Sequence, residues 1–169
     1  DRVAVSECDA LRQPLPTGAD VASLVRVIHD HDEGPALTLL KRAHEALPEY
    51  DCAIFISANA VEYGAPDPRR WPARLVAFAP GPGTAEALAD AGIAGARIPA
   101  TTFDSEGLLA LPELSAVRAK RILIFRGDGG REQLGETLRE RGARVDYVAC
   151  YRRAKPESGA MGLAEAFRD

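Results

Sequence analysis

Short apolar runs recur along the middle of the chain, and a turn and a stretch with helical spacing follow most of them. The runs cover residues 52–56, 74–78, 96–98, 121–125 and 144–151. Each run is nearly continuous rather than alternating, which is typical of strands buried on both faces of a parallel sheet. Strands that alternate with helices indicate an α/β domain. The pattern therefore predicts a doubly wound, five-stranded parallel sheet with a flavodoxin-like strand order.

Helical segments are expected between these strands and before the first one. They cover residues 35–47, 58–63, 84–91, 106–111 and a stretch that ends near 142. In the last of them Leu134 and Leu138 have the i, i+4 spacing of one helix face, and Gly142 is a suitable stop. Asp104 or Ser105 is the expected N-cap of the helix before it.

The two ends of the chain fit this domain poorly. The start is rich in proline and glycine, and the last residues begin a helix that does not continue. We therefore expect a complete domain over 28–153, with parts of a second, similar domain in 1–27 and 154–169. Residues 25–28 and 148–152 would be the two extended links between the domains.

Composition and charge narrow the possible functions. A hydrophobic content of 46%, a charged content of 27% and a formal net charge of −4 are those of a soluble globular protein. They argue against nucleic acid or a membrane surface as partner, and no apolar run has the ~20 residues that span a bilayer. Cys8, Cys52 and Cys150 form no CxxC pair, so we expect structural thiols and a cytoplasmic protein.

Two glycine-rich turns suggest nucleotide loops but differ from them in detail. A P-loop needs lysine and then serine or threonine after its last glycine, whereas Arg131 and Glu132 follow Gly130. The turn that begins at Gly81 has Glu86 where a dinucleotide loop needs a third small residue, and a carboxylate there would repel a pyrophosphate. The chain also lacks the nucleophile elbow of serine hydrolases.

One cluster could hold a metal ion. His29, Asp30 and His31 lie within a run of two histidines and three acidic residues, and in an extended segment the two histidines would share a face. The next histidine, His44, belongs to a separate predicted helix. We favour a solvated acidic linker and expect no metal site.

The remaining candidates follow the ends of the strands, where parallel strands bring their carboxyl ends to one edge of the sheet. They are Ser57, Ala58 and Asn59, then Gly81, Gly83, Thr84 and Ala85, and finally Arg126, Gly127 and Gly129. Such turns offer free backbone N–H groups that suit an anionic ligand, with a carboxylate as plausible as a phosphate. Ordinary capped turns between strands and helices would give the same pattern.

Taken in order, these turns resemble those of uroporphyrinogen-III synthases. The matching segments are 54–61, 81–88, 103–109, 122–132 and 145–153, and their order and spacing agree over about residues 35–155. Members of this family have two flavodoxin-like domains joined by a two-stranded link. Their chain starts in domain one, builds domain two and returns, which explains the poorly fitting ends. Family chains are longer than this one.

The resemblance implies a cytoplasmic, monomeric lyase of tetrapyrrole and heme biosynthesis that needs no cofactor. Its substrate is hydroxymethylbilane, which carries eight carboxylates, and the product is uroporphyrinogen III. The reaction inverts ring D through a spiro intermediate and releases water. The alternative is a non-catalytic flavodoxin-like module that binds an anionic small molecule.

By the same resemblance, Tyr151 matches the tyrosine proposed to assist loss of the substrate hydroxyl, and a phenol is a reasonable proton donor. An aromatic that packs at the domain junction is its alternative role. Ser57 and Thr84 match positions that face the family's cleft. Ile56 stands where threonine is common, and Ala79-Pro80 departs from the usual approach to the glycine turn.

Overall fold

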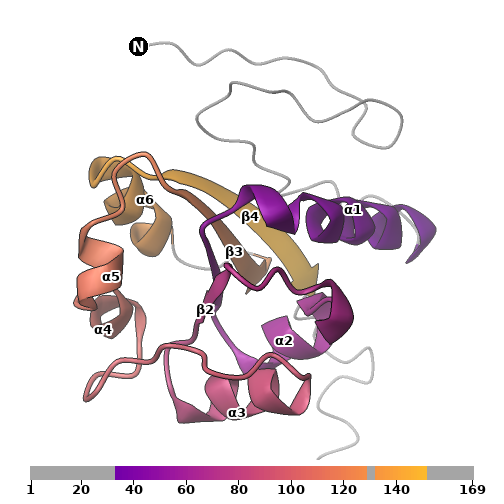
Figure 1. Ribbon diagram of the computed structural model, residues 1–169, viewed down its shortest axis with the longest axis horizontal. Helices are drawn as coiled ribbons and strands as arrows, with labels where there is room; N and C mark the ends of the chain where they lie inside the picture. The colour runs from indigo at the N-terminus through magenta and orange to yellow at the C-terminus, as the bar shows by residue number, and fades with distance from the viewer. Residues whose placement is uncertain (1–32, 129–131, 152–169) are drawn as a thin grey trace, which may run out of the picture.

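The fold is a parallel β-sheet with helices on both of its faces (Figure 1). In this computed structural model, residues 33–128 and 132–151 are described. The sheet order is β2-β1-β3-β4, and every neighbouring pair is parallel. The strands are β1 (Cys52–Phe55), β2 (Val76–Phe78), β3 (Arg121–Gly127) and β4 (Arg144–Tyr151). The predicted α/β class is therefore confirmed, while the predictions for 1–27 and 154–169 lie outside the described residues.

The helices agree with the predicted segments to within a few residues. They are α1 (Glu33–Ala46), α2 (Ala58–Gly64), α3 (Pro82–Asp90), α4 (Ser105–Leu109), α5 (Pro112–Ser115) and α6 (Gln133–Glu140). Helix α5 and the two 3-10 turns, Leu47–Glu49 and Pro68–Arg70, were not expected. Asp104 is the N-cap of α4, because its Oδ1 accepts a hydrogen bond from the Gly107 N–H at 2.8 Å. Among the described helices, none has the length and apolar character that would let it cross a bilayer.

The five-strand prediction is wrong at residues 96–98. This segment contributes a single parallel bridge, in which the N–H and carbonyl groups of Arg97 bond to Ala77 and Ala79. The bridge lies beyond β2 and adds no fifth strand, and the four described strands keep a flavodoxin-like order in which the third, β3, lies beside the first, β1. Gly92 and Gly95 take positive φ angles of 82° and 78°, so the chain is still turning when it reaches the sheet edge.

Alternate residues of the strands fill two separate cores, one on each face of the sheet. Helices α1, α2 and α3 lie over one face and α4, α5 and α6 over the other (Figure 1). On the first face the rings of Phe55 and Phe125 stack at 4.4 Å with an interplanar angle of 1°. Tyr147 and Ile124 belong to the second face. The doubly wound character of the sheet is thus confirmed.

The middle of the sheet is the point where the connections diverge. After β1 the chain passes to α2 on the first face, and after the neighbouring strand β3 it passes to α6 on the second. Loops that leave adjacent strands in opposite directions open a crevice at the carboxyl ends of those strands, which is where open α/β sheets bind their ligands.

Candidate functional site

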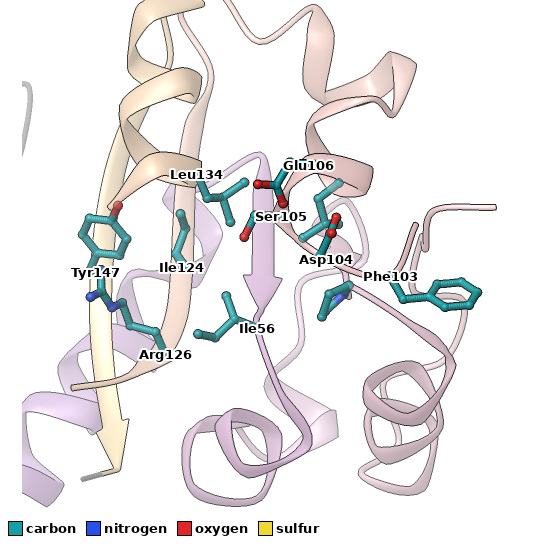
Figure 2. Close-up of a pocket in the computed structure, with 11 residues that line it drawn as sticks. Ile56, Phe103, Asp104, Ser105, Glu106, Ile124, Arg126, Leu134 and Tyr147 are labelled. Atoms are coloured by element: carbon teal, nitrogen blue, oxygen red, sulfur yellow. The ribbon is translucent and has the colours of Figure 1, made fainter. Parts of the chain in front are cut away.

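A pocket of about 370 Å³ lies in this crevice, at the ends of β1 and β3 and on the α4 and α6 side of the sheet (Figure 2). Its lining residues are Ile56, Pro80, Phe103, Asp104, Ser105, Glu106, Leu108, Ile124, Arg126, Leu134 and Tyr147. Both departures from the family pattern noted in the sequence, Ile56 and Pro80, belong to this lining. The volume is at the lower end of the range for small-molecule sites.

Arg126 is the buried cation of the pocket, with a side chain only 3% exposed. Its Nη1 lies 2.9 Å from Glu132 Oε1, and its Nε donates to the carbonyl of Gly127 at 3.3 Å. The guanidinium also lies 4.7 Å from the centre of the Tyr147 ring. A cation held against a ring face and beside a carboxylate is fixed in position. The predicted residue Arg126 thus faces the pocket.

Tyr147 is held between two cations, because Arg139 lies 5.2 Å from its ring centre in addition to Arg126. Burial raises the pKa of the Tyr147 phenol, and the negative charge of Glu132 acts in the same direction. Its Oη is buried without a hydrogen-bond partner within the described part of the chain. A Cβ at Gly135 would lie 1.9 Å from this Oη, so the glycine inside α6 makes room for the ring.

The other side of the sheet edge brings two predicted residues together. Ser57 Oγ and Tyr151 Oη lie 3.0 Å apart and share a hydrogen bond. Ser57 is also the N-cap of α2 and accepts from the Ala60 N–H at 3.1 Å. The Tyr151 ring lies against Gly127, where a Cβ would come within 2.7 Å of it, and tilts toward Tyr63 at a centroid distance of 6.2 Å.

A β-bulge in β4 explains how Tyr151 reaches Ser57. Arg126 pairs with Ala149, but the next residue, Gly127, pairs with Tyr151, so Cys150 is left without a register partner on β3. As a result the consecutive residues Cys150 and Tyr151 both pack on the α2 side of the sheet. Regular alternation would have placed them on opposite faces.

The glycine turn before α3 forms a third part of the edge. Gly81 lies against Phe103, since a Cβ on it would be 3.0 Å from the Phe103 Cβ. Thr84 is buried in the first turn of the helix and Ala85 is half-buried, whereas a Cβ on Gly83 would meet nothing within 4 Å. Close approach to protein atoms therefore accounts for the glycine at 81 and not for the one at 83.

Ala58 and Asn59 lie in the first turn of α2, where Asn59 is exposed. Gly129 lies outside the described residues, as does the His29-Asp30-His31 cluster. Within 33–128 and 132–151 no group of three His, Cys, Asp or Glu side chains could hold a metal ion.

Sequence reasoning missed three residues that shape the pocket: Phe103, Glu132 and Tyr147. Phe103 is 53% exposed, and its polar neighbours Thr102 and Asp104 give no sign that it lines a pocket. The signal for Tyr147 was indirect: a glycine inside an amphipathic helix often marks a close approach by another residue.

The fold and the pocket together define a doubly wound α/β domain with a candidate small-molecule site at the carboxyl edge of its sheet. The sequence model of one protein family, described as Uroporphyrinogen-III synthase HemD, matches residues 21–169, and the chain belongs to this family. The resemblance found in the sequence is therefore confirmed.

Known relatives agree with this assignment, and a solved structure agrees with the fold. The chain is 37% identical to the uroporphyrinogen-III synthase of Salmonella typhimurium, over 89% of this chain and 67% of that protein. It is 36% identical to the Escherichia coli protein of the same name, over 83% and 63%. The fold matches uroporphyrinogen III synthase from the extremely thermophilic bacterium Thermus thermophilus with a TM-score of 0.52 at 23% identity, over 75% of this chain and 51% of that one. The chain thus spans about two thirds or less of these proteins.

Proposed function

We propose that the protein acts as a uroporphyrinogen-III synthase, which cyclises hydroxymethylbilane to uroporphyrinogen III with inversion of ring D and loss of water. Membership of the family supports this proposal, as do relatives of that name at 36% to 38% identity. The observation that carries it is the hydrogen bond between Ser57 and Tyr151 at the sheet edge, because it joins the proposed proton donor to a second hydroxyl.

Tyr151 is the proposed catalytic residue. Its phenol would donate a proton to the leaving hydroxyl of the bilane as the C–O bond breaks, so that water departs. The electron pair that expels the hydroxyl comes from the adjacent pyrrole, and the chain needs no cofactor for this step. Ser57 would fix the direction of the phenol O–H. Close contact with Gly127 would fix the position of the Tyr151 ring at the sheet edge.

Substrate binding is proposed to use the rest of the edge. The eight carboxylates of the bilane require cations and N–H donors, and we assign these roles to Arg126 and to the backbone at Ala58, Asn59, Gly81, Gly83 and Thr84. Ala85, whose N–H donates to the Gly81 carbonyl at 3.1 Å, and Gly127 would give close access to the backbone. The assignment of Gly129 stays a prediction. The early N–H groups of α3 have no partner within the helix, as at any helix start. Holding the bilane folded brings its reacting ends together, which supplies much of the rate enhancement of a ring closure.

The test is the isomer that the protein makes. Full-length protein would be incubated with freshly prepared hydroxymethylbilane, and the type I and type III products would be oxidised and separated. We expect type III to predominate, while a protein-free control yields the spontaneous type I ring. Type I product alone from folded full-length protein would overturn the proposal and leave a binding module as the better description.

A cytoplasmic location is part of the proposal. It is supported by Cys52 and Cys150, which are both free thiols. The expectation of a monomer stays a prediction.

A further inference from the structure

The ion pair in the pocket joins a buried cation to an exposed anion. The side chain of Arg126 is 3% exposed, whereas that of Glu132 is 49% exposed, and their atoms lie 2.9 Å apart. A guanidinium that is buried without a counter-ion is strongly unfavourable, so a carboxylate is needed beside Arg126 whether or not a ligand is bound. Glu132 supplies it from the residue just before α6.

The carboxylate of Glu132 can move away from Arg126 at little cost. Half of its side chain already faces solvent, so its carboxylate can be fully hydrated after a small rotation. Arg126, in contrast, is fixed by its bond to the Gly127 carbonyl and by the face of the Tyr147 ring. An exchange of partner at Arg126 therefore moves the anion and leaves the cation in place.

The shape of the pocket suits a short acid arm on an apolar ring. Ile56, Ile124 and Leu134 lie around the space in front of Arg126, as Figure 2 shows. Across the pocket stand the carboxylates of Asp104 and Glu106, which would repel a second anionic group. The pocket thus accepts one carboxylate at the Arg126 end, attached to a body that can contact aliphatic side chains.

We propose that Glu132 occupies the place beside Arg126 that a substrate carboxylate takes on binding. One acetate or propionate arm of the tetrapyrrole substrate then displaces Glu132 from Arg126. This inference rests on the proposed function for the identity of the ligand. Because one carboxylate replaces another, the charge around Arg126 is unchanged by the exchange, and the buried cation is paired in both states. Arg126 is then a specificity-determining residue that selects substrates with an acid arm on the ring held in this pocket.

The binding test uses porphobilinogen, a single pyrrole with one acetate and one propionate arm, added to the ¹⁵N-labelled 169-residue chain. The Nε–H signal of Arg126 should shift with added porphobilinogen. Glu132→Gln keeps the size of the side chain and removes the competing charge, so it should lower the dissociation constant about three- to tenfold. Arg126→Gln should raise it at least about tenfold, and Arg126→Lys should give an intermediate value.

A matched control lies at the opposite end of the same strand. Arg121 also forms an ion pair, with Glu49 at 2.6 Å, but it is outside the pocket. Arg121→Gln and Glu49→Gln should leave porphobilinogen binding unchanged. Equal losses from Glu132→Gln and Arg126→Gln would overturn the proposal, since Glu132 would then only orient Arg126. An unchanged affinity in Arg126→Gln would overturn it as well.

Turnover separates this inference from the proposed function. If wild-type full-length protein makes type III product, Glu132→Gln should lower KM for hydroxymethylbilane and Arg126→Gln should raise it, with smaller effects on kcat. If wild-type protein makes type I product alone, the proposed function fails. The porphobilinogen titration still decides whether Arg126 exchanges Glu132 for an incoming carboxylate.

Discussion

At the scale of single residues, the position of Tyr151 depends on its neighbours in β3 and α2. Gly127 leaves room for the ring, because a Cβ there would lie 2.7 Å from it, and Ser57 shares a hydrogen bond with its hydroxyl. Tyr151→Phe keeps the ring and removes the proton donor. We expect the initial rate of type III formation to fall by about 10²-fold or more, the usual contribution of a positioned acid.

The matched control for this prediction is Tyr63→Phe, because Tyr63 is the exposed aromatic neighbour of Tyr151. It should keep wild-type activity. Both variants should unfold within about 1 kcal/mol of wild type, since each loses at most one hydrogen bond. A Tyr151→Phe protein with the wild-type rate would remove Tyr151 from the mechanism.

The described thiols should be unreactive in the folded protein. Burial raises the pKa of Cys150 to about 12 and also raises the pKa of Cys52, and only the thiolate attacks disulfide reagents. In a Cys8→Ser variant at about pH 8, near the ordinary pKa of a thiol, we expect slow labelling by an aromatic disulfide without denaturant. Both remaining thiols should react rapidly in denaturant. Fast labelling of the native variant would contradict this prediction.

At the scale of elements, α6 depends on a glycine in its interior. Gly135→Ala adds a methyl group that would lie 1.9 Å from Tyr147 Oη and 2.7 Å from its Cζ. Overpacking of a buried site costs about 1–3 kcal/mol, which exceeds the gain of at most about 1 kcal/mol in helix propensity. We therefore expect a lower free energy of unfolding, measured by urea denaturation.

Gly83→Ala in α3 is the control, because its new methyl group would meet nothing within 4 Å. It should unfold at the same urea concentration as wild type or a slightly higher one. Equal destabilisation by the two substitutions would mean that contact with Tyr147 does not set the cost at position 135.

Most elements could be predicted because the strands are continuous apolar runs and because residue types that favour the N-cap, such as Asp104, precede the helices. The strand at 121–125 and the strand at 144–151 were found close to their observed bounds, and Asp104 caps its helix as expected. The prediction of a strand at 96–98 was wrong because such a short apolar segment can form either a strand or a single bridge. Pairing with β2 is decided by tertiary packing.

The candidate site was harder to predict than the elements. Strand-end turns identified Ser57 and Arg126 as members of one edge, and the family resemblance added Tyr151. The sequence could not reveal that Arg126 faces α6 while Tyr151 faces α2. That division depends on the register shift in β4, which no local pattern encodes.

At the scale of the whole molecule, the pH dependence of stability should reflect His44, which joins α1 to α2. Its Nε2 lies 2.9 Å from the Gly64 carbonyl oxygen. Burial lowers the pKa of His44 below its ordinary value of 6.5, the bond to Gly64 acts in the opposite direction, and the charge of Arg70 lowers it further. The unfolded chain therefore binds this proton more readily than the folded one, so stability is lost as the pH falls below about 6.5.

The measurement is the free energy of unfolding in urea at about pH 7.5 and about pH 5.0, on either side of the ordinary histidine pKa, for wild type and for His44→Gln. Glutamine can still donate a hydrogen bond and does not titrate. We expect the loss of stability between the two pH values to be smaller in the variant than in wild type. Identical pH profiles would show that another group is responsible.

The register shift in β4 also affects how relatives can be compared with this chain. Before the shift, residues of β4 alternate, so that Tyr147 faces α6 and Val148 faces α2. After the shift the alternation is offset by one residue, so that Tyr151 faces α2. A relative that lacked one residue before the tyrosine and had a regular strand would still place its phenol on the α2 side, beside Ser57, because the tyrosine would take the place of Cys150. A relative that kept every residue but paired without the shift would instead turn its phenol toward the α6 pocket. A matching tyrosine therefore counts as evidence of shared chemistry when residue spacing and register shift together place it on the α2 side.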